Sequence, residues 1–262
     1  MCIVVCKPKN IELPKKCVLE QCFRSNPDGA GYMFAKDGTV HIKKGFMTFE
    51  SFYKSLLSDY SKELAFVLHF RIGTMGLNVP ELTHPYPLSK NMGVLRKTES
   101  ECPIGVAHNG IISLTTVYSY MNNHVEPDYN DTMKFITDYM SLIIKDKKFY
   151  KDDDTIEIIK KLVGTTNKFA LLDGDGHITT IGYFIEEDCI KYSNTSYEIY
   201  DYYSDRDWDM LLKKYDMYYD ETTESYFFPE GGCPLSESGE TCFCDICDKY
   251  LNNKCKYFKR GE

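Results

Sequence analysis

Three apolar runs constrain the fold of this chain most strongly, because each has the length and composition of a buried strand and each lies beside polar residues. They span residues 3–6, 64–70 and 105–112, and the last contains a polar His-Asn-Gly insert. Short apolar runs bounded by polar residues and glycine favour buried strands. The second run delivers Arg71 to its end, and a buried arginine needs an anionic partner.

The remaining patterns predict further strands and helices around these runs. Residues 27–31 are typical of a turn entering a strand, and Asp37-Gly38 predicts a hairpin. Strand-rich ends around central helices predict two sheets with helices packed against them. Helical spacing of apolar residues covers 46–60, 131–144 and 155–162, and a second hairpin covers 169–181.

Charge and hydropathy exclude several classes of partner. The net charge is −8 and the chain has no long cluster of lysine and arginine, which argues against nucleic acid as the main partner. No run approaches the roughly 18 apolar residues of a membrane span, and the start lacks the pattern of a secretory signal. We expect a cytoplasmic protein that acts on a small molecule or a protein.

The cysteines separate a body from a tail. In a reducing compartment, 11 cysteines indicate thiols or metal ligands more than disulfides. Five of them crowd into the last 30 residues, and tyrosine and acidic residues become denser from about residue 197. We therefore predict a body over 2–196 and a Tyr/Cys-rich extension over 197–262.

The cysteines of the extension suggest a metal site. Cys242, Cys244, Cys247 and Cys255 can place four thiolates around zinc, with Cys233 as a substitute ligand. Their spacing is not a repeated Cys-x-x-Cys pair, so a reduced cysteine-rich tail and an iron–sulfur cluster stay open as alternatives. Residues 207–215 predict a short helix.

The first apolar run begins directly after Cys2. Removal of Met1 would leave Cys2 with a free α-amine, which places a nucleophile and a base on one residue. An α-amine with a pKa of roughly 7.7–8 is suited to accept a proton near neutral pH. Taken alone, a cysteine beside an apolar strand is also typical of a buried structural thiol.

Five motifs in a fixed order favour a catalytic Cys2 over a structural one. After Cys2 come Asn-Pro-Asp-Gly-Ala-Gly at 26–31, His-Phe-Arg-Ile-Gly-Thr-Met-Gly at 69–76, Thr-His-Pro-Tyr at 83–86 and Ala-His-Asn-Gly at 107–110. This set resembles the class II glutamine amidotransferase domain, a family of the N-terminal nucleophile hydrolases, over about residues 2–196. The resemblance implies an α+β fold, a four-layer α/β/β/α sandwich, and the cysteine distribution adds a small Cys-rich C-terminal appendage.

The resemblance also assigns the reacting groups. Cys2 would attack the side-chain amide of glutamine, form a γ-glutamyl thioester and release ammonia. The Asn109 side chain and the Gly110 N–H would stabilise the negative oxygen, and such donors are worth about 2.7–4 kcal/mol each in comparable sites. A type I′ hairpin turn is the alternative for Asn109-Gly110.

Arg71 would hold the α-carboxylate of glutamine, because its planar fork grips two oxygens at once. A structural ion pair is the alternative for this residue. Thr74 would support the same carboxylate. Family members often have a histidine after this threonine, and Met75 replaces it here, which removes one donor from the expected set.

The other expected contacts involve Asp131, Asp28, Gly29 and His84. Asp131 would bind the α-ammonium group, and it also suits the N-cap of the following helix. Asp28 and Gly29 match a turn along the substrate pocket, where Gly29 would let the backbone approach a ligand and Asp28 is equally suited to a structural role. His84 is interpreted as a loop-ordering residue, and 192–196 as a closing strand.

The resulting hypothesis is a glutamine amidotransferase or glutaminase subunit with L-glutamine as substrate and no cofactor required for hydrolysis. The extension is too short for a synthase or ligase domain, so either a separate protein accepts the ammonia or the chain hydrolyses an amide for its own sake. Two alternatives stay open. One is an N-terminal nucleophile hydrolase of another amide, and the other is an inactive binding or adaptor protein on the same fold.

Overall fold

The computed structural model describes residues 2–73, 77–112 and 128–199, together with four short strands further along the chain. The chain divides into two compact units, Met1–Glu198 and Ile199–Glu262. In the second unit β12 (Tyr218–Asp220) pairs with β13 (Ser225–Phe227), and β14 (Tyr250–Leu251) pairs with β15 (Lys254–Cys255). The helix predicted over 207–215 lies outside the described residues. The functional assignments of 2–196 and 197–262 stay predictions.

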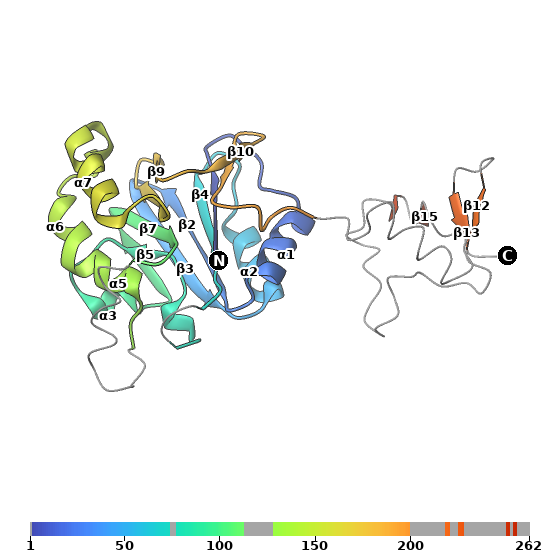
Figure 1. Ribbon diagram of the computed structural model, residues 1–262, viewed down its shortest axis with the longest axis horizontal. Coiled ribbons are helices and arrows are strands. Elements are labelled where there is room, and N and C mark those ends of the chain that lie inside the picture. Colours follow the sequence, from blue (N-terminus) through green and yellow to red (C-terminus); the bar gives the residue numbers. More distant parts are fainter. Residues whose placement is uncertain are drawn as a thin grey trace. The chain divides into compact units, whose positions relative to one another are not determined.

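A seven-stranded antiparallel sheet forms one half of the first unit, with strand order β10-β11-β1-β4-β2-β3-β6 (Figure 1). The Asp37-Gly38 turn joins β2 to β3, as predicted. Strand β1 lies between β11 and β4, and Ile3 pairs with Phe70. The strands are β1 (Ile3–Lys7), β2 (Ala30–Lys36), β3 (Thr39–Phe46), β4 (Phe66–Phe70), β6 (Glu99–Cys102), β10 (Ile185–Glu187) and β11 (Ile190–Tyr192).

A four-stranded antiparallel sheet forms the other half, with order β5-β7-β8-β9. Its strands are β5 (Tyr86–Pro87), β7 (Ile104–Asn109), β8 (Lys168–Asp173) and β9 (Ile178–Ile181). The predicted hairpin over 169–181 is confirmed as β8 and β9. Strand β7 contains His108 and Asn109 within its regular pairing, so the expectation of a polar insert between two strand halves was wrong.

Helices cover the outer faces of both sheets (Figure 1). The helical predictions over 46–60, 131–144 and 155–162 are confirmed with shifted ends, and the first helix was not predicted. The helices are α1 (Lys16–Ser25), α2 (Phe49–Asp59), α3 (Met92–Leu95), α5 (Asp131–Phe135) continuing through the π-helical η2 (Ile136–Met140) into α6 (Ser141–Ile143), and α7 (Asp153–Val163), with the 3-10 turns η1 (Pro80–Leu82) and η3 (Phe149–Lys151).

Three apolar clusters explain this arrangement. Because side chains alternate along a strand, Ile3 and Val5 pack with α1 and α2, whereas Val4 and Cys6 pack with residues of β7 and β8. The third cluster lies between the smaller sheet and the helices α5 and α7. Strands β1 and β7 therefore contact each other across the two sheets. The predicted pair of sheets with helices packed against them is confirmed.

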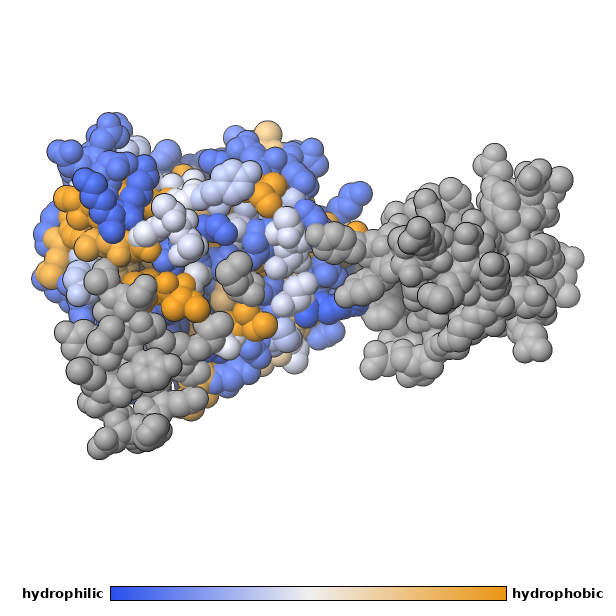
Figure 2. Space-filling view, viewed as in Figure 1, coloured by the Kyte–Doolittle hydropathy of each residue, from blue (hydrophilic) through white to orange (hydrophobic). Residues whose placement is uncertain are grey.

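Apolar surface is visible over α6 and α7 (Figure 2), the helices that carry the exposed side chains of Leu142 and Ile158. Among the described residues, no helix combines the length and the apolar character that crossing a membrane requires.

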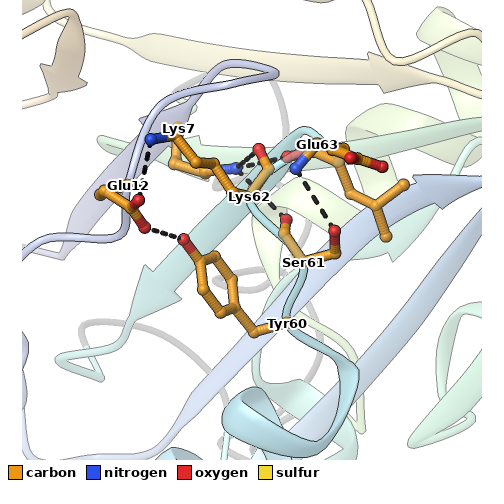
Figure 3. A network of polar contacts seen from close by, with 7 residues as sticks. Lys7, Glu12, Tyr60, Ser61, Lys62 and Glu63 are labelled. Atoms are coloured by element: carbon orange, nitrogen blue, oxygen red, sulfur yellow. Dashed lines mark hydrogen bonds and ion pairs between the residues drawn. The ribbon is translucent and has the colours of Figure 1, made fainter.

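The end of β1 is a fully buried lysine. Lys7 Nζ donates to the carbonyls of Lys62 and Leu64, both at 2.6 Å, and lies 5.4 Å from the centre of the Tyr60 ring. Around it, Glu12 pairs with Lys62 at 2.9 Å and accepts the Tyr60 hydroxyl at 2.5 Å (Figure 3). Burial lowers the pKa of Lys7 to about 8.

Candidate active site

Cys2 lies just before β1, beside the chain that leaves β4. Its sulfur is 3.4 Å from both the nitrogen and the carbonyl oxygen of Ile72, which follows Arg71. The thiol is partly buried, and this burial raises its pKa, while the Ile72 backbone and the Arg71 charge act in the opposite direction. The nearby cation therefore favours the thiolate that a nucleophile needs.

Two residues after β11 connect Cys2 to β7. Asn194 Nδ2 donates to the Cys2 carbonyl at 2.8 Å. The buried Ser193 hydroxyl oxygen accepts the Val4 N–H at 2.9 Å and lies at 2.9 Å from Asn109 Nδ2. One dipeptide therefore holds both the predicted nucleophile and the predicted oxyanion amide.

Asn109 is the last residue of β7, and its side chain is buried. Its backbone φ is not positive, whereas a type I′ turn requires a positive φ at both central residues. The hairpin alternative for Asn109-Gly110 is therefore wrong. The described residues Ile111 and Ile112 do not continue the strand, which corrects the expectation of a strand on each side. Asn109 Oδ1 has no hydrogen-bond partner among the described residues.

Gly110 leaves the strand with a φ of +144°, and a Cβ atom there would lie 2.2 Å from Asn167 Oδ1. Only glycine fits this position without displacing Asn167. Asn167 Oδ1 accepts from His108 Nε2 at 2.8 Å, and Asn167 Nδ2 donates to the Val163 carbonyl. The close packing against Asn167 fixes the direction of the chain directly after Asn109.

His108 is buried and neutral. Burial lowers its pKa, Nε2 carries the hydrogen that binds Asn167, and Nδ1 accepts the Thr132 hydroxyl at 2.8 Å. Its ring stacks on Phe169 at 4.3 Å. His108 therefore joins β7 to the start of α5, and it acts as a structural group next to Asn109.

Arg71 directly follows β4 and is buried. Its guanidinium donates to Asn78 Oδ1 at 3.0 Å and to the Leu77 carbonyl at 3.3 Å. Its backbone N–H donates to the Gly29 carbonyl at 2.8 Å. The arginine predicted to hold a carboxylate thus lies one residue from Ile72, which contacts the Cys2 sulfur.

Asp28 orders the loop beside Arg71. Its two carboxylate oxygens accept the Gly73 N–H at 2.7 Å and Asn78 Nδ2 at 3.1 Å. Gly29 packs tightly, since a Cβ atom there would lie 2.7 Å from the Thr83 side chain. These contacts agree with a structural role for Asp28, and its place in substrate binding stays a prediction. Thr74, predicted to support the substrate carboxylate, lies outside the described residues.

Asp131 begins α5 but does not cap it. The N-cap is Asn130, whose side chain accepts the Met133 N–H at 2.9 Å, so the capping interpretation of Asp131 was wrong. Asp131 Oδ2 accepts the Ile112 N–H at 2.8 Å, and Oδ1 accepts the Thr132 N–H at 2.8 Å. The carboxylate therefore faces the segment that follows Asn109-Gly110, where capacity for a further donor remains.

His84 lies between η1 and β5, with its ring 4.2 Å from the ring of His69 and 4.6 Å from that of Tyr86. Its carbonyl packs against Gly31, where a Cβ atom would lie 2.2 Å away. Burial lowers the pKa of His84 well below its usual value and that of His69 to about 3. Both rings are therefore neutral, and the packing supports the expected loop-ordering role.

Most of the cysteines proposed to bind zinc lie beyond the part of the chain that the structure describes. Cys242, Cys244 and Cys247 lie outside the described residues, and Cys255 belongs to β15. Within the described parts of the chain, no group of three or more histidine, cysteine, aspartate or glutamate side chains is arranged to hold a metal ion. The zinc site stays a prediction.

Cys2 and Arg71 lie at adjacent ends of β1 and β4, Asn109 and Gly110 lie at the end of β7, and Asp131 lies at the start of α5. The structure adds residues that the motifs did not indicate. Ser193 and Asn194 had been interpreted as part of a closing strand, but β11 ends at Tyr192 and both side chains bond to the site. The only sequence signal for them is their place directly after a strand. The other additions are Asn78, which bonds to Arg71, and Asn167, which packs on Gly110.

No protein-family model matches this chain. No curated protein matches it by sequence. Among solved structures, the chain is similar to glutamine phosphoribosylpyrophosphate (PRPP) amidotransferase from B. subtilis complexed with ADP and GMP, with a TM-score of 0.44 and 17% sequence identity. The match covers 75% of this chain and 42% of that chain, so this chain spans less than half of that structure's length.

Proposed function

We propose that this protein hydrolyses the side-chain amide of L-glutamine through Cys2, as a glutamine amidotransferase or glutaminase subunit. The single observation that carries the proposal is the Ser193-Asn194 dipeptide, which bonds to Asn109 and to Cys2. A nucleophile and an amide donor held by adjacent residues can act on one carbonyl group. The three apolar clusters between successive helix and sheet layers support a four-layer sandwich of the N-terminal nucleophile hydrolase type.

The proposed reaction needs Cys2 as the first residue of the mature protein. Its α-amine takes the thiol proton, and the sulfur attacks the carboxamide carbon of glutamine. The C–N bond then breaks, the departing nitrogen receives a proton, and ammonia leaves. Water cleaves the γ-glutamyl thioester in the same way, which yields glutamate and restores the thiol.

The proposed nucleophile depends on a base. Burial raises the pKa of the Cys2 thiol, so a free thiolate is scarce at neutral pH without a base. An α-amine on the same residue can supply that base, because it is already held next to the thiol by covalent bonds. The buried histidines His69 and His108 are poorly suited to this task, because burial lowers the pKa of both rings and makes them weak bases near neutral pH.

Recognition of a free amino acid is assigned to two opposite charges. Arg71 is proposed to bind the α-carboxylate, since it is buried next to Ile72 and presents a planar set of donors. Asp131 is proposed to bind the α-ammonium, since its carboxylate is directed at the segment after Gly110. We further propose that the released ammonia serves a separate synthase or ligase.

The decisive experiment is a glutaminase assay on the full chain after intact mass has shown that Cys2 is the first residue. Cys2→Ala should lower kcat by at least about 1,000-fold, as expected when a covalent nucleophile is removed. Cys189→Ala is the matched control, because Cys189 is an exposed free thiol on the same chain. Full activity in Cys2→Ala, or no glutamine hydrolysis by the wild type with a free Cys2 amine, would overturn the proposal.

A further inference from the structure

The side chain of Asn109 leaves one hydrogen-bonding group unused in a buried place. Ser193 Oγ lies 2.9 Å from Asn109 Nδ2 and 2.9 Å from the Val4 nitrogen, and both nitrogens donate to it. Asn109 Oδ1 has no partner among the described residues. Buried polar atoms are nearly always paired, so an unpaired oxygen next to a proposed reaction centre needs an explanation.

The hydroxyl group of Ser193 can explain the unpaired Asn109 oxygen. A serine can accept two hydrogen bonds and donate one. In this arrangement Ser193 accepts twice, and its own hydrogen has no acceptor among the described contacts. A half-turn of the Asn109 amide exchanges its oxygen and nitrogen at nearly unchanged positions. Ser193 can then donate to Oδ1, while it still accepts the Val4 N–H.

The two orientations have opposite effects on a developing oxyanion. The orientation in the structure directs a carboxamide oxygen away from Ser193, where it would repel a negative oxygen. After the half-turn, Nδ2 occupies that place with two N–H donors. Stabilisation of a tetrahedral intermediate needs donors aimed at the position where the negative charge develops.

We propose that Ser193 is a positioning residue that donates to Asn109 Oδ1 in the substrate-bound state and thereby turns Nδ2 toward the oxyanion. This inference rests on the proposed function and adds a residue to it. Ser193 does not touch the substrate and acts only through Asn109.

The surroundings hold Ser193 in place for this role. Its N–H donates to the Val4 carbonyl at 3.0 Å, so hydrogen bonds in both directions join it to β1. The following Asn194 is fixed by the Ser196 N–H on its oxygen, and it donates to the Cys2 carbonyl. The hydroxyl is therefore fixed relative to Cys2, and a rotation of Asn109 needs no movement of β1.

A double-mutant cycle in the glutaminase assay tests the inference. Ser193→Ala should lower kcat about tenfold, the scale of one lost orienting hydrogen bond, with KM within about twofold. Ser193→Thr keeps the hydroxyl and should recover most of this loss. In an Asn109→Ala background, Ser193→Ala should cause no further loss, because the amide that it orients is gone. Ser100→Ala is the matched control, a buried serine hydroxyl on β6.

An unchanged kcat in Ser193→Ala would overturn the inference. An equal loss from Ser193→Ala in the Asn109→Ala background would also overturn it, since the serine would then act on the fold. If Ser193→Ala does not fold, Ser193→Cys gives the same comparison, because a thiol keeps the size and donates weakly. Glutamine hydrolysis by the wild type separates these results from failure of the proposed function, which would remove both proposals.

Discussion

The two ends of β1 each carry a buried or partly buried reactive group, but the two groups differ in how fully the surrounding protein uses their hydrogen-bonding capacity. At one end, Lys7 Nζ donates to three backbone carbonyls, those of Ser61, Lys62 and Leu64. All three hydrogens of its ammonium group are used. At the other end, the Cys2 sulfur contacts only the backbone of Ile72 among its described partners, at the longer distance of 3.4 Å. A lysine held in this way is structural, whereas the thiol is oriented and still available.

Within the described part of the chain, most of the buried polar side-chain atoms that lack a hydrogen-bond partner lie near the Cys2 end of β1. Seven buried side-chain nitrogen or oxygen atoms lack a partner among the described residues, and four of them belong to His69, His84 and Asn109. His69 pairs with Val4, and Asn109 bonds to Ser193, so these atoms lie around the Cys2 end of β1. The other three atoms belong to Asn26, Ser100 and Asp173. Unused hydrogen-bonding capacity is therefore concentrated where a substrate would need it.

The largest loss of stability and activity is expected from Gly110→Ala, near the Cys2 end of β1. The new methyl group would lie 2.2 Å from Asn167 Oδ1, at a φ of +144° that disfavours alanine. Overpacking and backbone strain together should destabilise the protein by about 3–5 kcal/mol and displace Asn109. Urea unfolding of the full chain measures the stability change, and the glutaminase assay measures the loss of activity.

Gly38→Ala is the matched control for this substitution. Gly38 also has a positive φ, of +78°, but no atom lies within 4 Å of a Cβ atom built there. Its cost should be backbone strain alone, about 1–2 kcal/mol, with kcat unchanged. Equal destabilisation by the two substitutions would show that the contact with Asn167 has no part in holding the strand end.

A smaller effect is expected at the opposite end of β1, from Lys7→Met. Methionine fills much of the same volume, but it leaves the carbonyls of Lys62 and Leu64 without their 2.6 Å donor. The free energy of unfolding should fall by about 2 kcal/mol, with kcat for glutamine unchanged. Lys9→Met is the control, because exposed Lys9 donates to one carbonyl, that of Asp175, and should change stability by less than about 0.5 kcal/mol. A loss of kcat in folded Lys7→Met would remove the distinction between the two ends.

Local patterns predicted most of the fold. The Asp37-Gly38 hairpin and helix α2 follow from turn chemistry and from apolar spacing over neighbouring residues. Helix α1 was missed although its buried Leu19 and Cys22 have helical spacing, and no side-chain cap at Lys15 marks its start. Its formation depends on packing against the larger sheet, which no local window contains.

Only the site residues that belong to a sequence motif could be predicted from the sequence. Cys2, Asn109 and Gly110 stood out through residue order, and their neighbourhood is supported by the Ser193-Asn194 contacts. The bond from Asn109 to Ser193 spans 84 positions along the chain. A single serine after a strand has no distinguishing pattern, so this contact becomes visible only when the two sheets are packed.

The smallest expected effect concerns the pH dependence of Lys7. Burial lowers its pKa from 10.5 to about 8, so between pH 8 and 10.5 the unfolded chain binds a proton that the folded chain lacks. Stability from this residue should therefore rise with pH across that window and stay constant below it. Tyr60 and Glu12 lie beside Lys7, and the raised pKa of Tyr60 acts in the opposite direction at higher pH.

Subtracting the unfolding free energies of Lys7→Met from those of the wild type removes the contributions that both proteins share. The difference should change by roughly 1.6 kcal/mol in favour of the wild type between pH 8 and 9.5, since one pKa unit corresponds to about 1.4 kcal/mol. A constant difference would mean that the carbonyls and rings around Lys7 stabilise its charge as well as water does, and that this end of β1 carries no electrostatic penalty.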